Sequence, residues 1–192
     1  MQESLTLKHH VMALEEILDQ IKDEDFALKI DHLILEIVQC FTLGGKLLFF
    51  GNGGSSMDGA HIAAEFTGRF LMSRPSLPAF SLADNVAAVT SISNDFGYES
   101  VFARQIEGLA KVEDIAIGLS TSGTSINVIN GLICAKKIGL KTVMFTNSIA
   151  FFEPGAVDYL INIPSMTTAR SQEITLFLGH FIAGEVEKKL YA

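Results

Sequence analysis

Apolar residues return along residues 1–43 with the period of a helix. Two stripes with a spacing of three or four residues are separated by Asp23, Glu24 and Asp25, and acidic side chains at such a break are typical of a helix start. Gly44 and Gly45 end the second stripe, as glycines often do after helices. The sequence therefore predicts two N-terminal helices. Their apolar positions are Leu7, Val11, Leu14, Leu18 and Ile21 in the first, and Ile30, Leu33, Ile37 and Phe41 in the second.

Beyond residue 45, short apolar runs alternate with stretches of helical periodicity. Runs that are apolar at nearly every position are typical of strands buried on both faces, and strands that alternate with helices form parallel sheets. We predict an α/β fold, a three-layer sandwich with a five-stranded parallel sheet plus the two N-terminal helices. No linker interrupts the pattern, so residues 1–192 are interpreted as one domain, with 1–43 packing on it or on a neighbouring subunit. The expected strands are 46–50, 78–82, 114–119, 141–146 and 157–163, and the expected helices are 55–70, 84–93, 98–110, 125–138 and 168–190.

Two turns rich in glycine and serine each follow a predicted strand and precede a predicted helix. Residues 51–56 read Gly-Asn-Gly-Gly-Ser-Ser, and residues 120–125 read Ser-Thr-Ser-Gly-Thr-Ser. Glycines let the main chain approach an anion, and the N–H groups of a helix start point at it. Neither turn is a nucleotide-binding fingerprint. The two turns together favour a small phosphorylated metabolite, and the alternative is a pair of tight connections capped by Ser55 or Ser125.

Two pairs of polar side chains lie at helical spacing. His61 and Glu65 are four residues apart in the helix after the first turn, which places imidazole and carboxylate on one face. Gln172 and His180 lie on one ridge of the last predicted helix, eight residues apart. The alternatives are a surface His–Glu pair and a histidine satisfied within the core.

Two further polar groups lie near the predicted turns. Arg69 follows Gly68 and could hold a phosphate in bidentate fashion, or cap the end of a helix. Asn94 and Asp95 are expected in a loop before Gly97, where an Asx turn is the alternative to a binding role.

Composition narrows the class of ligand. The chain has a formal net charge of −8, which argues against general nucleic-acid binding and requires local donors at any phosphate site. Cys40 and Cys134 lie in apolar helical patterns and are expected to be buried thiols of a reducing compartment. The sequence shows no signal peptide and no run long enough to span a membrane, so a cytoplasmic protein is expected.

These motifs together resemble the sugar isomerase (SIS) family, over nearly the whole chain. The Ser-Thr-Ser-Gly loop alone marks the broad family, whereas the full set in this order resembles its isomerases of a phosphorylated heptose. The resemblance implies a flavodoxin-like SIS fold, a homotetramer and one Zn²⁺ per subunit. The motifs are residues 51–55, His61 with Glu65, Gly68 and Arg69, then 94–97, 120–125, and 172–173 with His180.

The same resemblance implies roles for individual residues. Glu65 and His180 match the acid/base pair. The positions that match zinc ligands are His61, Glu65, Gln172 and His180. The positions that match substrate-binding residues are Asn52, Gly53, Gly54, Glu65, Asn94, Asp95, Ser120, Thr121, Ser122, Ser125 and Gln172, with Ser55 and Arg69 expected in the same pocket.

The implied activity is an aldose–ketose isomerisation that converts sedoheptulose 7-phosphate to D-glycero-D-manno-heptose 7-phosphate, the first step of bacterial heptose biosynthesis. Its substrate would be a small sugar phosphate, with no nucleic-acid or membrane partner. One alternative is a non-catalytic adaptor of the type that associates with the DnaA initiator, which has no need for Glu65 and His180. The other is an isomerase of a different phosphosugar, such as arabinose 5-phosphate.

Overall fold

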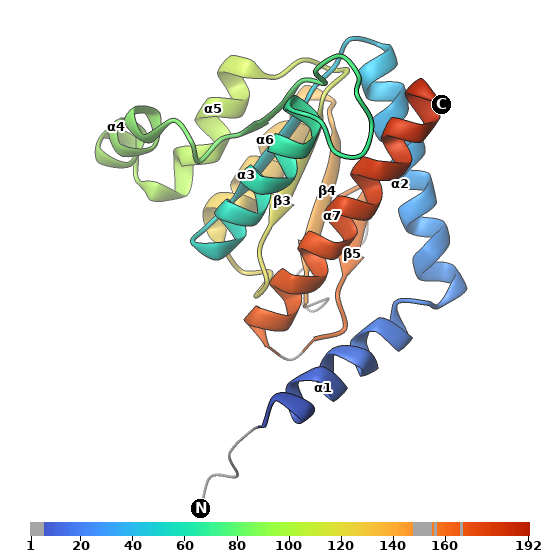
Figure 1. The fold of residues 1–192 in the computed structure, drawn as a ribbon. Coiled ribbons are helices and arrows are strands. Elements are labelled where there is room, and N and C mark those ends of the chain that lie inside the picture. The colour runs from blue at the N-terminus through green and yellow to red at the C-terminus, as the bar shows by residue number, and fades with distance from the viewer. Residues whose placement is uncertain (1–5, 148–154, 156, 166) are drawn as a thin grey trace, which may run out of the picture.

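The computed structural model describes residues 6–147, 155, 157–165 and 167–192. Within them, five parallel strands form one sheet in the order β2-β1-β3-β4-β5, with helices on both faces (Figure 1). This is the strand order of the flavodoxin-like folds. The predicted α/β sandwich with a five-stranded parallel sheet is therefore confirmed. The strands are β1 (Leu47–Gly51), β2 (Ala79–Ser81), β3 (Ile115–Leu119), β4 (Lys141–Thr146) and β5 (Tyr159–Asn162).

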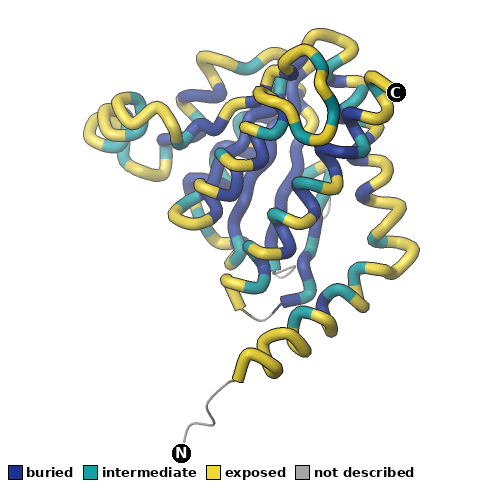
Figure 2. Tube along the Cα trace, in the orientation of Figure 1, coloured by how far each residue is buried: buried dark blue, intermediate teal, exposed yellow. Residues whose placement is uncertain are grey.

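The sheet separates two apolar cores because successive side chains of a strand point to opposite faces. Leu47 and Phe49 of β1 face the core formed with α2, α3 and α7, whereas Leu48 and Phe50 face the core formed with α5 and α6. Figure 2 shows the strands as the most deeply buried part of the chain. The helices are α1 (Leu7–Gln20), α2 (Glu24–Thr42), α3 (Gly54–Thr67), α4 (Val86–Phe96), α5 (Val101–Leu109), α6 (Ile126–Ile138) and α7 (Thr168–Tyr191).

The two N-terminal helices are present, but they are held very differently. Helix α2 packs against α7 and buries one face, with Asp23 as its N-cap, as predicted. Helix α1 projects away from the sandwich and buries only Ile17 (Figures 1 and 2). Its apolar side chains Leu7, Val11 and Met12 are exposed.

Helix boundaries differ from the predicted ones at two places near the expected site. The prediction of a loop at Asn94 and Asp95 is wrong, because α4 continues through both residues to Phe96. Gly97 follows as the C-cap, and its φ of 85° ends the helix. Helix α3 ends at Thr67 rather than at residue 70, because the Arg74 side chain takes over main-chain carbonyls at that end. Residues 98–100 form a short 3₁₀ turn before α5 rather than its first turn.

The two cysteines agree with the expectation of buried thiols in part. Cys40 is buried in α2, and burial raises the pKa of its thiol to about 12. Cys134 is only partly buried in α6, and partial burial raises its pKa too.

Among the described residues, no helix has the length and apolar content needed to cross a bilayer.

Phe50→Ala should lower the free energy of unfolding by about 3–5 kcal/mol, because it empties a fully buried site beside the ring of Phe102. Urea unfolding followed by circular dichroism measures the change. The matched control is Phe80→Ala on the neighbouring strand, where the ring is 53% exposed, with an expected effect within about 0.5 kcal/mol. Equal effects of the two substitutions would contradict the assigned core.

Candidate active site

The two glycine/serine turns begin side by side at the carboxyl edge of the sheet. Strands β1 and β3 are neighbours, and Gly51 lies opposite Leu119 in their register, so each turn leaves the sheet at the same level. The chain order reverses between β1 and β3, and parallel α/β sheets bind ligands at such a switch point. The structure thus brings together the two turns that the sequence singled out.

The first turn leads directly into α3. Gly53 is the N-cap with a φ of 55°, a conformation that residues with a side chain rarely adopt, and no side chain caps the helix. The alternative of Ser55 as a simple N-cap is therefore wrong, since Ser55 is buried inside the first turn of α3. A side chain at Gly54 would collide with the amide of Gln172. Gln172 of α7 thus lies over the start of α3.

The second turn is held by its own hydroxyl groups. The Ser120 hydroxyl donates to the Ser125 hydroxyl at 3.0 Å, and the hydroxyl oxygens of Ser122 and Thr124 are 2.9 Å apart. Ser125 is the N-cap residue of α6, but its side chain makes no capping hydrogen bond. The turn therefore presents several hydroxyls beside a helix N-terminus, an arrangement suited to a phosphate.

His61, Glu65 and His180 converge from two helices. The Nε2 atoms of the two histidines are 3.0 Å apart, and Glu65 Oε1 lies 3.4 Å from His61 Nε2 and 3.9 Å from His180 Nε2. His61 and Glu65 are on one face of α3, as their spacing predicts, and α7 supplies His180. The prediction that imidazole and carboxylate share a face of α3 is thus confirmed by geometry.

These three side chains could hold a metal ion, since their ligand atoms lie within 4.8 Å of one another. A tetrahedral zinc site with metal–ligand bonds of about 2.0–2.1 Å has ligand atoms about 3.3 Å apart, a value that lies within the observed range of 3.0–3.9 Å. The Gln172 amide, which α7 supplies, lies over Gly54 at the start of α3, the helix that carries His61. The donor set of two imidazoles and one carboxylate is also one that zinc prefers.

Asp58 adds a buried negative group one turn before His61. Burial raises the pKa of its carboxyl to about 6, and nearby His61 opposes that shift. Among the described residues, its Oδ2 atom is buried without a hydrogen-bond partner. A carboxylate left unpaired at this place is consistent with a cation bound at His61. Asp58 was not among the residues predicted from the sequence, although its spacing of three residues from His61 is a usable signal.

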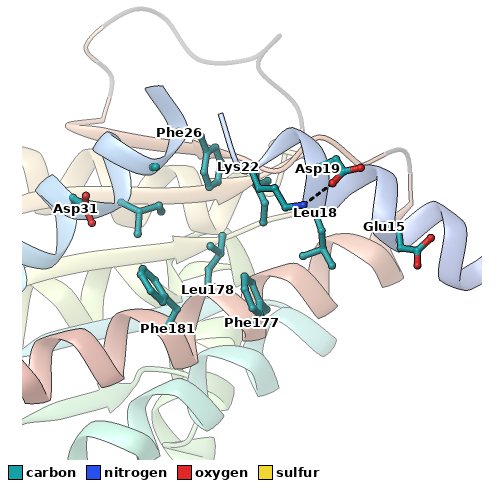
Figure 3. A pocket seen from close by; sticks show the side chains of 12 residues that line it. Glu15, Leu18, Asp19, Lys22, Phe26, Asp31, Phe177, Leu178 and Phe181 are labelled. Carbon is teal, nitrogen blue, oxygen red and sulfur yellow. Dashed lines mark hydrogen bonds and ion pairs between the residues drawn. The ribbon is translucent and has the colours of Figure 1, made fainter. Parts of the chain in front are cut away.

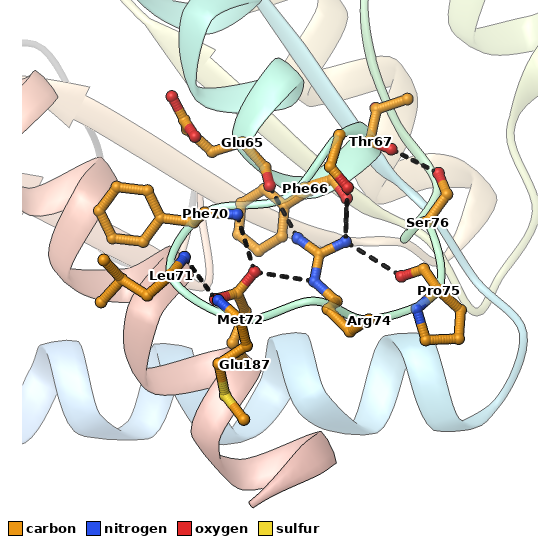
Figure 4. A network of polar contacts seen from close by, with 11 residues as sticks. Glu65, Phe66, Thr67, Phe70, Leu71, Met72, Arg74, Pro75, Ser76 and Glu187 are labelled. Carbon is orange, nitrogen blue, oxygen red and sulfur yellow. Dashed lines mark hydrogen bonds and ion pairs between the residues drawn. The ribbon is translucent and has the colours of Figure 1, made fainter.

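Glu187 of α7 and Arg74, from the loop after α3, form an ion pair with both side chains fully buried (Figure 4). Their Nε and Oε1 atoms are 2.9 Å apart. The same carboxylate accepts hydrogen bonds from the three main-chain N–H groups of residues 70–72, at 2.9–3.0 Å. Burial alone raises the pKa of Glu187, but these donors and the guanidinium outweigh it and hold the pKa below its usual value.

This network also fixes the helix end that carries Glu65. Arg74 donates to the main-chain carbonyls of Glu65 at 2.7 Å and Phe66 at 2.6 Å, while the Glu65 side chain points away from the network (Figure 4). The ring of Phe70 stacks parallel to His180, with centroids 5.3 Å apart. The ion pair thus connects both helices of the His61, Glu65 and His180 cluster.

Other predicted site residues lie outside this cluster. Arg69 is exposed in the loop after α3. Asn94 and Asp95 are exposed at the end of α4, where the Asn94 amide donates to the Asp95 carboxylate at 2.8 Å. Their assigned roles in substrate binding stay predictions.

A separate apolar pocket of about 520 Å³ lies between α1, α2 and α7 (Figure 3). Leu18 and Phe26 face Phe177 and Phe181 across it. None of the predicted site residues lines this pocket. It is therefore a different feature from the polar edge of the sheet.

Comparison with known proteins gives a consistent result. The family model described as SIS domain matches residues 9–147. The phosphoheptose isomerase of Thermodesulfovibrio yellowstonii is 43% identical over 176 residues, which span 90% of this chain and 87% of the relative. That of Clostridium acetobutylicum is 38% identical over 185 residues, which span 96% and 93%.

Solved structures agree with these relatives. The phosphoheptose isomerase of Neisseria gonorrhoeae is 30% identical with a TM-score of 0.83, over 95% of this chain and all 100% of that chain. The phosphoheptose isomerase of Francisella tularensis is 25% identical with a TM-score of 0.89, over 95% and 96%. The likeness therefore extends beyond the residues that the family model matches.

Glu187→Ala should lower the free energy of unfolding by about 3–5 kcal/mol, because it leaves the buried Arg74 guanidinium without its partner. The control is Glu185→Ala on the same helix, where the ion pair with Lys188 is exposed and contributes at most about 1 kcal/mol. Chemical denaturation of both variants measures the difference. Equal losses would show that the buried pair does not hold α3 and α7 together.

The lowered pKa of Glu187 also predicts a pH dependence. Its stabilisation is present above the ordinary pKa of a glutamate, about 4.3, and is lost as the pH falls through the lower value in the folded protein. Acidification from about pH 5 to pH 3 should therefore destabilise the unsubstituted protein more than Glu187→Gln. Parallel stability–pH curves for the two proteins would contradict this.

Proposed function

This chain belongs to the SIS-domain family and, within it, to the phosphoheptose isomerases, and we propose that it interconverts sedoheptulose 7-phosphate and D-glycero-D-manno-heptose 7-phosphate. The observation that carries this proposal is the convergence of Glu65 Oε1 and His180 Nε2, 3.9 Å apart, in a chain whose two phosphate-type turns leave neighbouring strands at the same level. An acid/base pair and a phosphate anchor are what an isomerase of a sugar phosphate needs.

The turn of residues 120–125 anchors the phosphate in this proposal. Its hydroxyls and the N–H groups at the start of α6 supply donors without a cationic side chain, which suits a chain with a net charge of −8. Ser120, Thr121, Ser122 and Ser125 are the proposed donors. A fixed phosphate holds the reacting end of the sugar at a set distance, which is a large part of the catalytic effect.

Glu65 and His180 transfer the protons in the proposed reaction. One of them removes the proton from C1 of the ketose and gives an enediolate, and a proton is then delivered to C2 while the hydroxyl proton moves from O1 to O2. The proton removed from C1 is balanced by the one added at C2. The same two groups run the reverse direction.

The proposed metal is one zinc ion held by His61, Glu65, Gln172 and His180. The described geometry of three of these side chains and the unpaired Asp58 carboxylate support the site. When bound, zinc polarises the substrate oxygens as a Lewis acid. Oε1 of Glu65 makes the contacts with both imidazoles. In this proposal Oε1 is the metal ligand, and the second carboxylate oxygen acts as the base.

The described acid/base geometry favours this proposal over a non-catalytic adaptor, which has no need for a convergent Glu65 and His180. We also propose a homotetramer. The exposed apolar face of α1, the helix that projects from the sandwich, and the pocket beside it supply an apolar surface for a second copy of the chain.

Glu65→Gln and His180→Ala should each lower kcat for sedoheptulose 7-phosphate by about 10²–10⁴-fold, the usual contribution of a positioned acid or base. Glu173→Gln, an exposed glutamate of the same α7 helix, is the control and should keep kcat within about twofold. A coupled assay of the aldose product gives the rates. Either variant of the pair with unaltered turnover would rule out its catalytic role.

Zinc titrated calorimetrically into chelated protein should bind at one site per chain, and chelation should abolish turnover until zinc is restored. His61→Ala should weaken binding at least about tenfold, because it removes one ligand. His32→Ala is the control, since that histidine is exposed on α2. Zinc binding that survives His61→Ala unchanged would place the metal elsewhere.

A further inference from the structure

A junction of three side chains joins the two turns of the site. Asn52 lies in the first turn, Asn127 lies in the first turn of α6 just after the second, and Tyr98 follows Gly97 at the end of α4. Asn52 Nδ2 donates to Asn127 Oδ1 at 2.9 Å, and Asn127 Nδ2 donates back to Asn52 Oδ1 at 2.8 Å. The two amides thus form a closed pair that joins the turn after β1 to the start of α6, which follows the turn after β3.

The direction of this pair is fixed by the main chain. The N–H of Val128 donates to Asn127 Oδ1 at 3.0 Å, and an N–H can meet only an acceptor. The amide nitrogen of Asn127 must therefore face Asn52, and the reciprocal bond follows. Asn127 is only 2% exposed, so the loss of Asn52 would leave the buried amide nitrogen of Asn127 without the acceptor it uses.

Tyr98 adds the third connection. Its hydroxyl donates to Asn52 Oδ1 at 2.8 Å, although its ring is 51% exposed. Both lone pairs of that oxygen are then used, and one Nδ2 hydrogen is bonded to Asn127. Only one N–H of the Asn52 amide is left for a ligand, and its direction is set by the other two residues.

We propose that Asn127 and Tyr98 are positioning residues that set the distance between the phosphate anchor at residues 120–125 and the start of α3. This inference rests on the proposed function. The anchor holds one end of the substrate, and α3 carries Glu65, which must reach the other end. Because the Asn52–Asn127 pair joins these two elements, it fixes the span that the sugar must fit. A small error in that span lowers the rate strongly.

The test compares Asn127→Ala, Tyr98→Phe and the control Asn130→Ala. Asn130 is one turn further along α6, and its amide donates to the main-chain carbonyl of Glu99 at 3.1 Å, so it ties α6 to the 3₁₀ turn at residues 98–100 but not to the first turn of the site. Each variant is assayed for kcat and KM with sedoheptulose 7-phosphate. The dissociation constant of inorganic phosphate is measured by calorimetry, and the unfolding temperature confirms the fold.

Asn127→Ala should lower kcat/KM at least about tenfold, while the dissociation constant of inorganic phosphate changes by less than about twofold. Inorganic phosphate needs only the anchor, whereas the sugar phosphate needs the span. Tyr98→Phe should lower kcat/KM about threefold. The variant that combines Asn127→Ala with Tyr98→Phe should have a kcat/KM no lower than that of Asn127→Ala alone, because both residues act on one oxygen of Asn52. Asn130→Ala should lower kcat/KM less than Tyr98→Phe does, because it removes no hydrogen bond to Asn52.

Three outcomes would overturn the inference. They are an unaltered kcat/KM in Asn127→Ala, an equal weakening of inorganic phosphate, and an equal effect of Asn130→Ala. If Asn127→Ala does not fold, Tyr98→Phe decides alone by the same comparison, since it removes a single oxygen from a half-exposed ring. An unsubstituted protein that binds phosphate but does not convert the sugar would refute the proposed function, and the inference with it.

Discussion

The buried ion pair between Arg74 and Glu187 is the interaction on which the site geometry depends most. His61 and Glu65 come from α3 and His180 comes from α7, so their separations of 3.0–3.9 Å require two helices held in fixed register. Glu187 binds the three N–H groups of residues 70–72, and Arg74 binds the carbonyls at the end of α3. Both charged side chains are fully buried, so each is stable only while all of these partners are in place. Because the partners belong to α7 and to the end of α3, the two helices are held in one relative position.

The parallel sheet supplies the second constraint. It places the carboxyl ends of β1 and β3 at one edge, so the two turns open side by side at the switch point. The Asn52–Asn127 pair then joins the turns, and α3 runs from the first turn to the His61, Glu65 and His180 cluster. The proposed phosphate anchor and the proposed proton-transfer groups are thereby connected through hydrogen bonds and α3.

Most of the fold could be predicted from the sequence because the strands are apolar at nearly every position and their helices follow in alternation. The end of α4 could not, because the decisive residue was Gly97 rather than the polar pair before it. In the site, local spacing revealed His61 and Glu65. Arg74 with Glu187, and Asn52 with Asn127, were missed because each pair is far apart in sequence, by 113 and 75 residues. Glu187, beside two lysines, resembles any exposed residue of a helix.

Incorporation of solvent deuterium tests the central claim, that Glu65 and His180 carry the proton between C1 and C2. The reaction is run on sedoheptulose 7-phosphate in D₂O, and C2 of the aldose product is examined by NMR. The side chains of Glu65 and His180 are 23% and 37% exposed, so a proton held by either exchanges with solvent. We predict deuterium at C2. Conversion without deuterium there would contradict the account, because a hydrogen that never exchanges with D₂O has not been held by either of these two solvent-accessible groups.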